Sequence, residues 1–109
     1  MHVMVIPEEW EAPITRQTIE GKLEDLQKIV DGYIEFVDVE SRECSIICNE
    51  EGLIRSLPLN ERATAFLWRN APEHLNQTVF VGDVIVVGLI DDEGDTTECP
   101  EDIFAEFGV

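Results

Sequence analysis

Apolar residues recur along this chain in short blocks whose spacing predicts alternating strands and helices. Residues 2–7 and 83–90 are apolar at both odd and even positions, a pattern typical of strands covered on both faces of a sheet. β-branched and aromatic residues predict further strands at 13–20, 33–39 and 44–49. Only four residues separate the last two blocks, so we expect them to form a hairpin.

Three other segments show helical spacing. Residues 22–31 carry apolar side chains on one face and charged ones on the other, and Gly32 stands where a helix C-cap belongs. A second helix is expected over 60–71, with Asn60 as its N-cap. A short third helix is expected within 100–108, between a proline at its start and a glycine at its end.

The expected order of elements is therefore β-β-α-β-β-α-β-α. Hairpins mixed with helices favour an α+β fold, a mixed or mostly antiparallel sheet with short helices. The 109 residues are expected to form a single domain, 1–109, in which 92–109 is an acidic C-terminal segment with a short helix. No apolar run is long enough for a bilayer and the N-terminus lacks a signal-peptide pattern, so we expect a cytoplasmic protein.

The strong excess of acidic residues is the most unusual feature of the sequence. The chain has 24 acidic and 7 basic residues, a net charge of −17, and no Lys or Arg follows Arg69. Such a surface repels phosphate backbones and anionic lipids, so we expect no direct binding of nucleic acid or membrane. A protein with a basic surface is the expected partner. The acidic surface of the C-terminal third comprises Asp91, Asp92, Glu93, Asp95, Glu98, Glu101 and Asp102.

The segment from residue 49 to 60 is the best candidate for binding a ligand, because it is an expected surface loop between a strand and a helix, where binding residues concentrate. Three of the chain's five arginines lie inside or near it. Arginines could hold a small anion by bidentate contacts, or they could neutralise the protein's own carboxylates. Trp68 either closes the edge of the core or serves as an exposed anchor. The candidate binding residues are Asn49, Glu50, Arg55, Asn60, Arg62 and Arg69.

Metal and catalytic chemistry are not indicated. Cys44 and Cys48 would lie on one face of a strand but roughly 13 Å apart, too far for a disulfide or one zinc ion. With Cys99 they are expected to be buried, inert thiols in a reducing compartment. Neither His2 nor His74 belongs to a recognisable nucleophile–base pattern. We expect no metal, no cofactor and no enzymatic activity.

Several short motifs follow one another in a fixed order along the chain. They are Gly32-Tyr33-Ile34-Glu35 after a helix with Leu26 and Val30, the turn Asn49-Glu50-Glu51-Gly52, the helix entry Leu57-Pro58-Leu59-Asn60 with Ala63, and the strand from Gly82-Asp83 to Gly88. In this order they resemble the motifs of the domain of unknown function 3846 family. The resemblance covers residues 1 to about 91 and leaves the acidic end outside it. It implies a small protein of bacteriophage, plasmid, actinobacterial or archaeal genomes and brings no established activity.

Two functions remain in competition. The first is an acidic binding protein that imitates the charge array of DNA and inhibits a host DNA-binding or defence protein. The second is a module or sponge for a small anionic ligand or nucleotide, centred on residues 49–62. A homodimer through an exposed sheet edge stays open as a third option, and acidity can also serve solubility alone.

Overall fold

The computed structural model, which describes residues 1–109, is a five-stranded sheet with three helices. The strand order is β2-β1-β5-β4-β3, and all neighbouring strands are antiparallel. The predicted α+β class and element order are confirmed, and the sheet contains no parallel pair. The elements are β1 (His2–Ile6), β2 (Thr15–Thr18), α1 (Leu23–Val30), β3 (Ile34–Val39), β4 (Cys44–Asn49), α2 (Glu61–Asn70), β5 (Val84–Gly88) and α3 (Glu101–Phe107), with 3₁₀ turns at Glu40–Arg42 and Pro72–His74.

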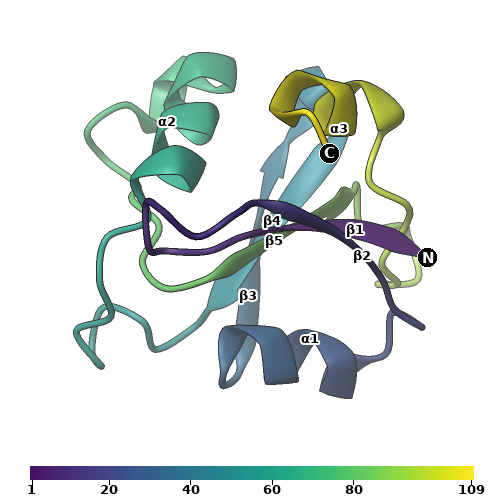
Figure 1. The fold of residues 1–109 in the computed structure, drawn as a ribbon, viewed down its shortest axis with the longest axis horizontal. Helices are drawn as coiled ribbons and strands as arrows, with labels where there is room; N and C mark the ends of the chain where they lie inside the picture. Colours follow the sequence, from purple (N-terminus) through teal and green to yellow (C-terminus); the bar gives the residue numbers. More distant parts are fainter.

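The sheet separates two apolar clusters, because α1 covers one face while α2 and α3 cover the other (Figure 1). Successive side chains of the central strands β1, β5 and β4 point to opposite faces and enter different clusters. Val84 and Val86 pack in the cluster under α2 and α3, whereas Ile85 and Val87 pack in the one under α1. The continuous apolar runs predicted as doubly covered strands are therefore central strands.

Local backbone details correct three expectations. The left-handed C-cap of α1 is Asp31, with φ 60°, and not Gly32. Pro100 precedes α3 and does not belong to its first turn. The strand expected at 13–20 is shorter, because only its middle pairs with β1.

Gly52, in the turn after β4, does not take a positive φ. Its lack of a side chain is required because a Cβ atom there would lie 2.7 Å from Val81 Cγ2.

The two edge strands of the sheet differ in what they present to solvent. β2 has four residues and carries one basic side chain, Arg16, which pairs with Glu101 of α3 at 2.8 Å. β3 is longer and exposes Glu35, Phe36 and Asp38. Charged side chains on an edge strand discourage pairing with another sheet. None of the helices has the length and hydropathy needed to cross a membrane.

One carboxylate at the end of β1 lies in an unfavourable place. Glu8 Oε2 is buried without a hydrogen-bond partner, and Asp83 accepts a hydrogen bond from the Glu8 backbone N–H at 2.9 Å. Burial, then the charge of Asp83, then that of Glu9 raise the pKa of Glu8. The folded protein therefore binds the Glu8 proton more tightly than the unfolded chain does.

Replacing Glu8 with glutamine is expected to stabilise the protein at neutral pH. A raised folded-state pKa stabilises the fold only while the group stays protonated, and that contribution is lost as pH rises through the folded-state pKa. The gain in melting temperature from Glu8→Gln should be present at pH 7 and shrink in acid, below the ordinary pKa of a glutamate. Glu11→Gln, an exposed change of equal charge, is the control. Equal gains in melting temperature from both variants would contradict the assignment of the destabilisation to the buried Glu8 carboxylate.

Candidate functional site

The chain between β4 and α2 forms a tight turn that is held by its own backbone. Gly52 N–H donates to Asn49 O, Arg55 N–H to Glu51 O at 2.9 Å, and Leu57 N–H back to Gly52 O at 3.0 Å. Ser56 takes the left-handed conformation, with φ 55°. These bonds turn the backbone polar groups inward, so the apolar pair Leu53 and Ile54 projects from the turn.

Asn49 fastens this turn to the end of α1. Its side-chain amide donates to Val30 O at 3.0 Å and to Asp31 O at 3.1 Å, and its oxygen accepts from Glu51 N–H at 2.8 Å. The side chain is buried. It satisfies carbonyls that a helix end leaves without an intrahelical donor. Asn49 is therefore a structural link between two segments.

Arg55 reinforces the same connection from the outside. Its guanidinium donates to Asp31 O at 2.6 Å and to the Asp31 carboxylate at 3.2 Å. A cation at a helix C-terminus is also favoured by the helix dipole. The predicted binding residue Arg55 thus positions the turn, and its positive charge is paired with the Asp31 carboxylate of the same chain.

Asn60 performs three tasks at the start of α2. Its side-chain oxygen accepts from Ala63 N–H, which confirms the predicted N-cap. Its amide group donates to Ile6 O and to Gly82 O, each at 2.9 Å. The side chain is completely buried. Asn60 therefore joins α2, the end of β1 and the entry to β5 at one point.

The three arginines of the predicted ligand site are not brought together. Arg62 donates to Pro7 O and Glu9 O, each at 2.9 Å, and lies over the Trp10 ring. Arg69 pairs with Glu106 of α3 at 3.3 Å. The five hollows in the surface include none that an arginine lines. No convergent arginine pocket for an anion is therefore formed.

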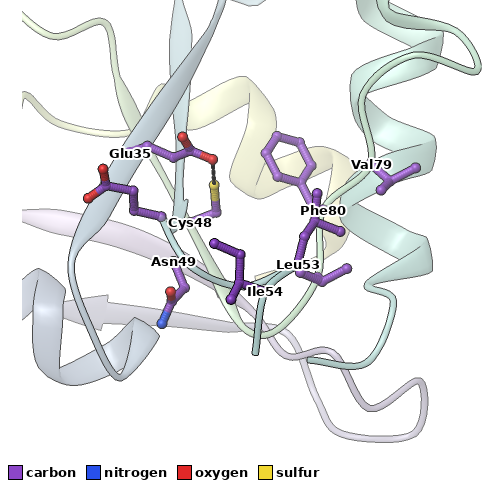
Figure 2. A pocket seen from close by; sticks show the side chains of 9 residues that line it. Glu35, Cys48, Asn49, Leu53, Ile54, Val79 and Phe80 are labelled. Carbon is purple, nitrogen blue, oxygen red and sulfur yellow. Dashed lines mark hydrogen bonds between the residues drawn. The ribbon is translucent and has the colours of Figure 1, made fainter. Parts of the chain in front are cut away.

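A hollow of about 260 Å³ does lie beside the turn (Figure 2). Asn49 and Glu50 are the only predicted binding residues that line it. The remaining lining residues come from β3, from β4, from the turn itself and from the segment before β5: Glu35, Cys48, Leu53, Ile54, Val79, Phe80 and Val81. Sequence reasoning missed Glu35, Leu53, Ile54 and Val79 as site residues. Two adjacent apolar residues inside a polar turn were the available signal.

The thiol in this hollow is not set up as a nucleophile. Cys48 is buried, and its Sγ donates to Glu35 Oε1 at 3.7 Å (Figure 2). Burial and then the Glu35 carboxylate raise the pKa of Cys48 to about 12. Burial likewise raises the pKa of Cys44 and Cys99 to about 12, and all three cysteines are free. The expectation of buried thiols is confirmed.

Much of the acidic C-terminal third is paired with groups elsewhere in the chain. Glu101 pairs with Arg16 and Asp102 with Arg42. Glu98 accepts from His2 N–H at 2.9 Å, and Asp91 accepts from the backbone of the turn that follows it. Asp92, Glu93 and Asp95 form no ion pair. No group of three or more metal-ligating side chains is placed to hold an ion.

Unpaired carboxylates gather instead along the edge strand β3 and its neighbours. Asp38 and Glu40 share a hollow of about 460 Å³ with Glu73 of the turn after α2. Five of the seven basic residues form ion pairs, and all of these pairs are with other carboxylates. We call this surface the β3 acidic strip. It consists of Glu35, Asp38, Glu40, Glu43, Glu50, Glu51 and Glu73, none of which pairs with a basic side chain.

The sequence model of one family, described as domain of unknown function (DUF3846), matches residues 1–108. Because the match covers nearly the whole chain, this protein belongs to that family. The acidic C-terminal segment lies inside the match, which corrects the expectation that the resemblance ends near residue 91. No curated protein and no solved structure matches the chain significantly.

Proposed function

We propose that this member of a family without an assigned activity is a non-enzymatic binding protein that docks on a basic protein. It would occupy the surface with which a DNA-binding or defence protein of a host cell contacts nucleic acid. The observation that carries this proposal is the β3 acidic strip, a set of carboxylates without basic partners. These side chains have the charge needed to replace phosphates against Lys and Arg.

The strip holds its charges on ordered elements, although more sparsely than DNA does. DNA displays roughly one negative charge per 1.7 Å of its axis, and a strand advances roughly 3.3 Å per residue. Glu35 and Asp38 of β3 therefore lie roughly 10 Å apart along the strand, on opposite faces of the sheet edge, and Glu40 and Glu43 follow in the next turn. The support for the proposal is thus the lack of basic partners along this edge, and not a match to the phosphate spacing.

The anion-binding alternative has weaker support. Arg55 and Arg62 are engaged with the chain's own carbonyl and carboxylate groups, and neither lines a hollow. The hollow beside the turn contains Glu35 and Glu50, whose charges oppose an anionic ligand. A nucleotide would meet repulsion there, so we propose a basic protein partner only.

The proposal predicts that this protein displaces DNA from a basic protein. This protein should retain basic proteins from lysate of the cell that carries its gene, and salt should elute them. A purified protein from that eluate should release its labelled DNA when this protein is added. The strip variant Glu35→Gln/Asp38→Asn/Glu40→Gln/Glu73→Gln should require about tenfold more protein for displacement, because each lost charge pair is worth roughly 0.2–1 kcal/mol.

A control variant separates the strip from net charge. Glu11→Gln/Glu24→Gln/Asp92→Asn/Glu93→Gln removes the same charge at exposed positions outside the strip. It should displace DNA nearly as well as the unchanged protein. Failure to release DNA from any retained protein at low salt, or equal losses in the two variants, would overturn the proposed function.

A further inference from the structure

Exposed apolar side chains from two separate segments lie around Val79, which is itself exposed. Leu53 and Ile54 project from the turn with 71% and 84% of their surfaces exposed. Leu59, before α2, and Val79, before β5, are also exposed. Single exposed apolar residues are ordinary, but contiguous ones mark surfaces that dock a partner.

These side chains line two hollows that share Val79. The first is the hollow of about 260 Å³ beside the turn, with Leu53 and Ile54 at its mouth (Figure 2). The second, of about 250 Å³, is lined by Leu59, Ala65 and Trp68. We call the two hollows together the Val79 groove. Its lining is apolar except for a few side chains, as in most binding sites.

The groove is held in shape by hydrogen bonds beneath it. The Trp68 indole N–H donates to Thr78 O at 2.7 Å, which fixes the ring. Leu59 and Val81 form an isolated antiparallel bridge, and Asn60 N–H donates to Phe80 O at 2.8 Å. A preformed groove loses little conformational entropy when a partner enters.

The charge of the groove selects the partner. Its ionisable lining residues, apart from the buried Cys48 thiol, are Glu35, Glu50 and Glu61, and none of these carboxylates forms an ion pair. A second copy of this chain, at net charge −17, and an anionic lipid surface are both repelled. Lys or Arg beside apolar side chains would complement both features of the groove.

We propose that the Val79 groove receives a segment of the partner protein in which apolar side chains stand next to Lys or Arg. This inference rests on the proposed function, because Glu35 and Glu50 belong to both the groove and the β3 acidic strip. The strip supplies attraction over a broad surface. The apolar groove supplies the local contact that decides which basic protein stays bound.

Three labelled synthetic peptides of equal length test the inference by fluorescence anisotropy. One alternates clusters of Leu and Lys, the second has Ser in place of Leu, and the third has Glu in place of Lys. The Leu–Lys peptide should bind most tightly. Ile54→Ser should weaken it roughly tenfold, as expected for losing one buried aliphatic side chain, and leave the Ser–Lys peptide unaffected. Leu23→Ser, an exposed apolar change on α1, is the matched control.

The outcomes separate this inference from the proposed function. Equal binding of the Leu–Lys and Ser–Lys peptides, unaffected by Ile54→Ser, would overturn the groove and leave the acidic strip in place. Equal binding of the Leu–Glu and Leu–Lys peptides would overturn the charge argument. Self-association that Ile54→Ser abolishes would identify a second copy as the occupant instead. No binding of either Lys peptide at low salt would count against groove and proposed function together.

Discussion

Replacing Asn60 with alanine is expected to lower the free energy of unfolding by about 2–4 kcal/mol. Loss of the N-cap costs about 1 kcal/mol. Ile6 O and Gly82 O would lose their donor in a fully buried place, and an unsatisfied buried group costs about 1–3 kcal/mol. Urea unfolding followed by the fluorescence of Trp10 and Trp68 measures the change as a lower midpoint.

Asn60→Asp separates the cap from the two donors. An aspartate can still accept from Ala63 N–H, but it cannot donate to both carbonyls, and its charge would face their oxygens. We therefore expect Asn60→Asp to be destabilised at pH 7 and to recover in part when the carboxyl is protonated. A loss from Asn60→Ala below about 0.5 kcal/mol, the range of ordinary surface changes, would contradict the role assigned to Asn60.

Replacing Asn49 with alanine is expected to cost about 1–3 kcal/mol and to loosen the turn that presents Ile54. The carbonyls of Val30 and Asp31 would lose a buried donor, and Glu51 N–H its acceptor. Hydrogen exchange should become faster at the backbone N–H groups of residues 50–57, and chemical denaturation measures the stability. The Leu–Lys peptide should also bind less tightly, because Asn49 lines the groove and holds the turn that carries Leu53 and Ile54.

Arg55→Ala is the comparison for Asn49→Ala. The ion pair between Arg55 and Asp31 is exposed, and such pairs contribute about 0–1 kcal/mol. Arg55→Ala should therefore cost less stability than Asn49→Ala. A larger loss from Arg55→Ala would show that the exposed pair, and not the buried amide, holds the turn to α1.

The fold was largely predictable because its signals are local or periodic. Runs that are apolar at both odd and even positions indicated the strands β1 and β5, and apolar residues at helical spacing indicated α1 and α2. Errors occurred where a neighbour distant in sequence decides the local conformation. The C-cap of α1 was expected at Gly32 but lies at Asp31, where the side chain of Arg55 contacts the helix end.

The candidate site was less predictable because side-chain partners are set by tertiary contacts. Three arginines close together in sequence pair with α1, with the loop after β1 and with α3. The sequence also pointed to the segment between β4 and α2 as a binding site, but Asn49, Arg55 and Asn60 hold that segment in place through contacts within the chain. The apolar residues that line the hollow come from three places: from β4, from the turn between β4 and α2, and from the segment before β5.

The sequence by itself determined the element order, the α+β class, the family resemblance and the excess of negative charge, because each follows from composition or from residues near one another. Only the tertiary structure decided which carboxylates form ion pairs with basic side chains and which do not. Folding brings Arg16 and Arg42 against the acids of α3, and it leaves the strip along β3 without a base. Ion pairing depends on the distance between two side chains in space, and that distance does not follow from their separation in the sequence.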